Sequence, residues 1–150
     1  MNIHDVSAQP TTDCSKLVTG TYLTTQSGNF GSFRGLMTLT PDGNFVYSGS
    51  NQNVAPSALD PSVPAPYGNA LGSWKCTSDT EITGTSLNFT YPTATLPGAI
   101  ARGDFRAKFD QSGIVQATST VKSFNLNADP LNDDAPVTGT VTFTGQHVIP

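Results

Sequence analysis

The chain has 150 residues, of which only 12% are charged, and a net charge of -4. A chain of this length fits one domain. Acidic and basic residues are scattered singly, so the sequence has neither the basic stripe that binds nucleic acid nor the polybasic segment that binds an anionic membrane. No apolar stretch approaches the ~20 residues that a membrane-spanning helix needs. We therefore expect no nucleic-acid partner and no membrane insertion.

The N-terminal residues 1–13 are polar and contain a proline, which predicts a flexible arm before one domain over residues 14–150. The first residues lack the basic and apolar regions of a signal peptide. We expect a soluble protein that is either cytoplasmic or secreted with its signal peptide removed. Cys14 and Cys76 fit both locations, because they can form one disulfide or remain two small buried thiols.

Alternation of apolar and polar residues predicts eight β-strands, because successive side chains of a strand point to opposite faces. The pattern is clearest over residues 137–145, where every even position is threonine. Turns rich in glycine and asparagine or aspartate favour antiparallel hairpins. In chain order, the predicted strands cover residues 17–25, 32–40, 45–49, 70–77, 81–91, 100–109, 114–126 and 137 to about 147.

Residues 50–68 interrupt this pattern with four prolines. Proline is unsuited to a sheet ladder, and a loop of this length in a compact domain is usually either functional or disordered. We expect this segment to cover one end of the sheet in part. Residues 127–136 form another predicted loop, and its aspartates do not have the spacing of a calcium-binding loop. The sequence therefore predicts no metal and no cofactor.

Eight sequential antiparallel strands predict an all-β fold, which we expect to be a single up-and-down barrel. A barrel leaves no unpaired sheet edge and encloses an interior for side chains or a small ligand. A Greek-key β-sandwich is the alternative, because the number of strands fits both. The parity of the strands predicts these inward residues: Gly20, Tyr22, Phe33, Gly35, Met37, Leu39, Phe45, Tyr47, Gly72, Trp74, Phe105, Ala107, Val141 and Phe143.

The first predicted strand opens with Gly20-Thr21-Tyr22, and the segment from Gly35 to Phe45 contains the turn Pro41-Asp42-Gly43. These features resemble the opening strands of lipocalins and related calycin barrels, with tyrosine where that family has tryptophan. The resemblance covers about the first third of the chain. It implies a lipocalin-like barrel that holds a small molecule in its interior.

The predicted lining is mostly aromatic and aliphatic, which suits a small hydrophobic or aromatic ligand. The same side chains could equally fill a solid core. The candidate ligand-binding residues are Tyr22, Phe33, Met37, Phe45, Tyr47, Trp74, Phe105 and Phe143.

The sequence contains no nucleophile elbow, phosphate-binding loop or dinucleotide fingerprint. An enzyme on this scaffold would therefore be a cyclase or isomerase, in which Tyr22, Tyr47 or Arg34 stabilises developing charge. A third hypothesis is a structural or adhesive module whose threonine-rich faces contact other proteins. The sequence favours a carrier of a small molecule over these two alternatives, and it leaves the ligand and the oligomeric state open.

Overall fold

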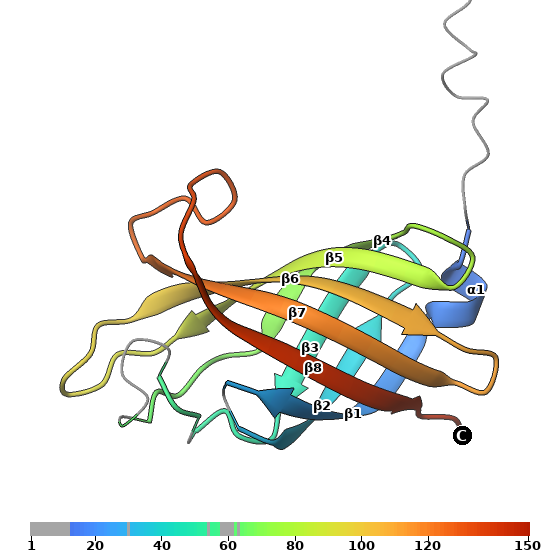
Figure 1. Ribbon diagram of the computed structural model, residues 1–150, viewed down its shortest axis with the longest axis horizontal. Coiled ribbons are helices and arrows are strands. Elements are labelled where there is room, and N and C mark those ends of the chain that lie inside the picture. The colour runs from blue at the N-terminus through green and yellow to red at the C-terminus, as the bar shows by residue number, and fades with distance from the viewer. Residues whose placement is uncertain (1–12, 30, 54, 58–61, 63) are drawn as a thin grey trace, which may run out of the picture.

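The structure, a computed structural model, describes residues 13–29, 31–53, 55–57, 62 and 64–150. Eight antiparallel strands close into one up-and-down barrel in which β1 pairs with β8 (Figure 1). The predicted all-β barrel is thus confirmed against the Greek-key alternative. The strands are β1 (Gly20–Gly28), β2 (Phe33–Leu39), β3 (Asn44–Gly49), β4 (Ala70–Cys76), β5 (Glu81–Thr90), β6 (Ala99–Phe109), β7 (Ile114–Asn125) and β8 (Val137–His147).

The structure differs from the sequence prediction at the start of the first strand. Leu17 and Val18 belong to α1 (Ser15–Val18), a single helical turn, and β1 begins only at Gly20. Val18 is fully buried, and its carbonyl accepts a hydrogen bond from the Tyr22 hydroxyl at 3.0 Å. A helix of one turn is too short to show a helical period, so the strand-like alternation dominated the prediction.

The N-terminal arm predicted over residues 1–13 lies, apart from Asp13, outside the described residues. In the part of the chain that is described, no helix has the length and apolar character needed to cross a membrane.

The two ends of the barrel are built differently. Tight connections over residues 40–43, 77–80 and 110–113 lie at the same end as α1, which we call the closed end. The described parts of the longest connections, over residues 50–69, 91–98 and 126–136, lie at the opposite end, which we call the loop end (Figure 1). Binding residues are found disproportionately on loops held by a rigid scaffold, so a binding site is expected at the loop end.

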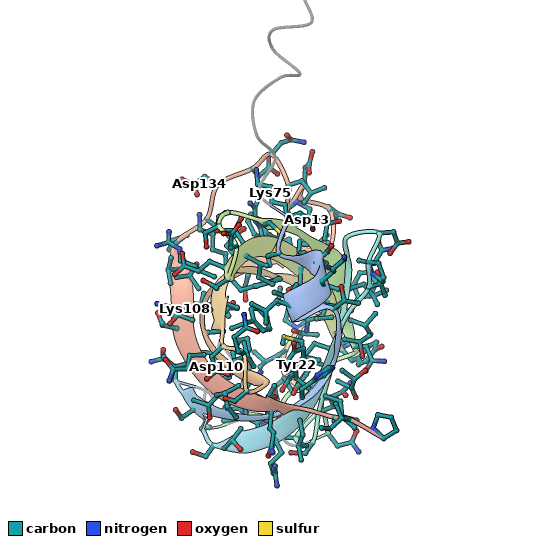
Figure 2. All side chains as sticks on the ribbon, turned by 90° about the vertical axis from the view of Figure 1, so that its right-hand side faces the viewer. Asp13, Tyr22, Lys75, Lys108, Asp110 and Asp134 are labelled. Carbon is teal, nitrogen blue, oxygen red and sulfur yellow. A yellow bond between two sulfur atoms is a disulfide. The ribbon has the colours of Figure 1, made fainter. Side chains whose placement is uncertain are left out.

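Side chains fill the closed end. Figure 2 looks along the barrel from this end and shows Tyr22 inside the ring of strands. The Tyr22 ring stacks on His147 with centroids 4.9 Å apart and meets Phe109 edge-on at 5.3 Å. Cys14 and Cys76 form a disulfide that ties the residue before α1 to β4. Helix α1 is therefore a plug that is covalently attached to the barrel wall.

The barrel interior contains the side chains that strand parity assigned to it. Among the residues predicted to face inward, Gly20, Phe33 and Gly72 are half-buried. The others are buried: Tyr22, Gly35, Met37, Leu39, Phe45, Tyr47, Trp74, Phe105, Ala107, Val141 and Phe143.

Replacing Trp74 by alanine should lower the free energy of unfolding by about 3–5 kcal/mol, the range for a large aromatic side chain that leaves a cavity. Trp74 is 8% exposed, and its indole nitrogen donates a hydrogen bond to the Asn44 carbonyl at 3.0 Å. Urea unfolding followed by circular dichroism measures the change. Leu71→Ala is the matched control, because Leu71 is on the same strand and 60% exposed. A Trp74 loss as small as that of the control would contradict the packing described above.

Replacing both Cys14 and Cys76 by alanine should lower the free energy of unfolding by about 2–4 kcal/mol, because a cross-link restricts the unfolded chain. The two cysteines are 62 positions apart in the sequence, so the closed loop is long. Urea unfolding should give the same midpoint for the double variant as for the reduced wild-type protein. Equal stability of the oxidised protein and the variant would show that the cross-link contributes nothing.

Candidate functional site

A cavity of about 180 Å³ lies inside the loop end of the barrel. Side chains from all eight strands line it, together with parts of the connection between β3 and β4. Phe45 and Phe105 are the lining residues nearest the closed end on β3 and β6, and their ring centroids are 4.6 Å apart. This aromatic pair separates the cavity from the filled half of the barrel.

One side of the cavity is apolar. It is formed by the strands on the β8–β1–β2–β3 side of the barrel, which are consecutive in the closed sheet. The apolar and aromatic residues that these strands contribute to the wall are Phe33, Phe45, Tyr47, Val141 and Phe143. A buried amide, Gln26 on β1, is the polar member of this side. This part of the wall matches the apolar interior expected from the sequence.

The other side of the cavity is largely polar. Strands β5 and β7 contribute hydroxyl and amide side chains, and β6 between them contributes small residues at the same height. The polar residues are Ser86, Asn88, Thr90, Ser119 and Ser123. The small ones are Ala101 and Gly103. None of the described residues that line the cavity carries a charged side chain.

The connection between β3 and β4 crosses the loop end and forms part of the cavity wall through Ala55, Pro56 and Tyr67. Its backbone is paired with itself and with the barrel: the Ala65 amide donates to the Ala55 carbonyl, and the Gly68 amide to the Phe89 carbonyl, both at 2.8 Å. Ala55 and Ala65 are buried. The described part of this segment is therefore a hydrogen-bonded cap.

The phenol rings of Tyr47 and Tyr67 lie on the same side of the cavity, and each has room only because a neighbouring residue is glycine. A Cβ atom added at Gly35 would lie 2.0 Å from the Tyr47 hydroxyl, and one added at Gly49 would lie 2.1 Å from the Tyr67 hydroxyl. Gly35 and Gly49 are partners in the β2–β3 ladder. Only glycine at these two positions leaves room for both rings. The Tyr67 hydroxyl donates a hydrogen bond to the Asn51 side chain.

Burial raises the pKa of both phenols above the ordinary value for tyrosine. It raises the pKa of Tyr47 to about 12, an effect that the nearby Thr24 hydroxyl opposes. Burial also raises the pKa of Tyr67, and the proximity of Tyr47 adds to the effect. The Tyr47 and Thr24 hydroxyls are both buried without a well-formed hydrogen bond to another described residue. The Tyr47 hydroxyl lies against Gly35 in the barrel wall, and Tyr47 is also a lining residue of the cavity.

The candidate ligand-binding residues from the sequence divide between the two halves of the barrel. Those that line the cavity are Phe33, Phe45, Tyr47, Phe105 and Phe143. Tyr22, Met37 and Trp74 also face inward, but they pack in the hydrophobic core outside the cavity wall.

The three candidate catalytic residues are not brought together. Tyr22 lies near the closed end, where its hydroxyl is bonded to the Val18 carbonyl. Arg34 is exposed on the outer face of β2. Its backbone amide donates a hydrogen bond to the Ser50 hydroxyl, in the connection between β3 and β4, at 3.0 Å. Of the three, Tyr47 alone is among the described residues of the cavity wall.

Sequence reasoning missed the polar residues of the cavity, including Gln26, Ser86 and Ser119. On β5 the large apolar residues Leu87 and Phe89 face outward, whereas polar side chains such as Ser86 face the interior. This is the reverse of the arrangement expected for a strand with one face in solvent. Ile82 on the same strand could have revealed the inward direction of Ser86. Ile82 is fully buried, and residues four positions apart on a strand point to the same face.

Within the described residues, no group of three or more His, Cys, Asp or Glu side chains is arranged to hold a metal ion. In comparisons with known proteins, no family model matches the chain, and neither a curated protein nor a solved structure matches it significantly. The eight-stranded barrel is compatible with a lipocalin-like fold, a resemblance that no known relative confirms.

The stability of the protein should fall as the pH rises from about 10 to about 12. Burial raises the pKa of Tyr22 and Tyr47 from 10.0 to about 12. The two phenols therefore contribute fully to the free energy of unfolding below about pH 10, and this contribution is lost as the pH rises through the folded-state pKa. Urea unfolding at a series of pH values measures this decline. Tyr47→Phe should make the decline shallower, and an unchanged slope would show that this phenol does not contribute.

Proposed function

We propose that the protein binds a small uncharged molecule in the cavity at the loop end of the barrel. The observation that carries this proposal is the cavity itself, in which aromatic side chains from one side face hydroxyl and amide groups from the other. Ligand sites in proteins typically combine an apolar lining with a few polar groups that orient the ligand. Ala101 and Gly103 leave space in the cavity wall that larger apolar side chains at these positions would fill.

The size of the cavity limits the ligand to about one ring. Its volume is about 180 Å³, whereas pockets for drug-sized ligands are about 300–1,000 Å³ and an engineered cavity of about 150 Å³ binds benzene. A long acyl chain or a polycyclic compound is therefore too large for the cavity in this conformation. The ligand class is therefore narrower than the small hydrophobic or aromatic molecules expected from the sequence.

The absence of charge among the described lining residues argues for an uncharged ligand. Burying an ion without an opposite charge is strongly unfavourable. An acid or an amine would have to enter in its neutral form.

A carrier function fits this geometry better than catalysis. The cap and the plugged closed end enclose the ligand space, while the residues considered for a cyclase or isomerase are dispersed over the core, the cavity and the outer face. Catalysis needs groups positioned together around the reacting atoms. We therefore propose that the ligand is held and released unchanged.

Ala101→Phe should weaken ligand binding by filling the cavity, since Ala101 lines it in the middle of the polar side. Isothermal titration calorimetry with toluene and other uncharged single-ring compounds measures the affinity, and benzoate is the charged comparison. Gln116→Phe is the matched control, because Gln116 is exposed on the outer face of the barrel. Circular dichroism verifies that both variants are folded.

We expect the uncharged rings to bind the wild type and the Gln116 variant alike, and to bind the Ala101 variant at least about tenfold more weakly, a change of about 1.4 kcal/mol. Equal binding to the two variants would place the ligand elsewhere. Conversion of a bound compound to a product would argue for catalysis over a carrier function.

A further inference from the structure

We propose that the Ser86 and Ser119 hydroxyls form a subsite that hydrogen-bonds an oxygen atom of the ligand. This inference rests on the proposed function and narrows it to one chemical class. The class is uncharged single-ring compounds with a hydroxyl or carbonyl oxygen at one edge, such as phenols and cyclic ketones.

The two hydroxyls converge on one point of the cavity wall. Ser86 on β5 and Ser119 on β7 flank β6, where Gly103 is paired with Ser86. A Cβ atom added at Gly103 would lie 3.1 Å from the Ser86 hydroxyl oxygen and 3.2 Å from the Ser119 hydroxyl oxygen. Both oxygens therefore lie close to the space above Gly103, which a larger residue would occupy.

Neither hydroxyl has a hydrogen-bond partner among the residues that the structure describes, although Ser86 is only 8% exposed. Neither oxygen is sealed off, in contrast to the hydroxyls of Thr24 and Tyr47, which are fully buried. Because Ser86 lines the cavity, the accessible part of its side chain faces the cavity. A buried hydroxyl without a partner is unfavourable, so an oxygen atom placed here would gain two hydrogen bonds.

Aromatic side chains on both sides of the serine pair can hold the rest of the ligand. Phe143 is on β8, next to the β7 strand that carries Ser119, and Phe45 on β3 is level with Ser86 two strands away. Both line the cavity, so a ring can pack against them and direct one edge at the two serines. A ligand without an oxygen at that edge would leave both hydroxyls unpaired, and a site built to hydrogen-bond a group discriminates against analogues that lack it.

The test compares p-cresol with toluene, which differ only by the hydroxyl group, in isothermal titration calorimetry. The wild-type protein should bind p-cresol about tenfold more tightly than toluene, because hydrogen bonds at the subsite favour the phenol. The double variant Ser86→Ala, Ser119→Ala should lose this preference and retain its affinity for toluene. Ser73→Ala is the matched control, because Ser73 is exposed on the outside of β4.

Gly103→Ala is an independent variant that leaves both serines in place. Its added methyl group would occupy the point on which the two hydroxyls converge, so it too should reduce the preference for p-cresol. If both probes bind but the wild type shows no preference for p-cresol, or the variants keep the full preference, the subsite is wrong and the cavity remains the binding site. If neither probe binds the wild type, the proposed function itself fails.

Discussion

Closure of the sheet between β1 and β8 is the constraint on which the rest of the structure depends. The ladder runs from the pair Tyr22–His147 to the pair Gly28–Val141. It removes both free edges of the sheet and forces every inward side chain to share one enclosed space. The volume of each inward residue therefore decides whether a given level of the barrel is filled or empty.

The difference between the two halves of the barrel follows from residue size. Toward the closed end, rings and branched side chains such as Tyr22, Phe109 and Val115 meet across the interior and exclude any ligand. Toward the loop end, Ala101 and Gly103 on β6 leave space that the aromatic residues of the opposite side do not fill. The same strands thus supply stability at one end and a candidate site at the other.

The sequence predicted the strands well because alternation is a local property that each strand carries by itself. It failed at Leu17 and Val18, where a single helical turn follows the same alternation. Parity also showed that Phe33, Tyr47 and Trp74 face the same interior, but whether a side chain borders empty space depends on its neighbours across the barrel. Serines on β5 and β7 were missed, because a polar residue on a strand is usually taken to face solvent.

The position of the chain ends has a practical consequence. The C-terminal residues follow β8 to the closed end, where the Val148 amide donates to the Thr21 carbonyl at 2.7 Å, and α1 lies at the same end (Figure 1). The described chain therefore begins and ends on the side of the barrel away from the cap. A partner protein or a surface attached through the C-terminus would therefore leave the cap facing solution.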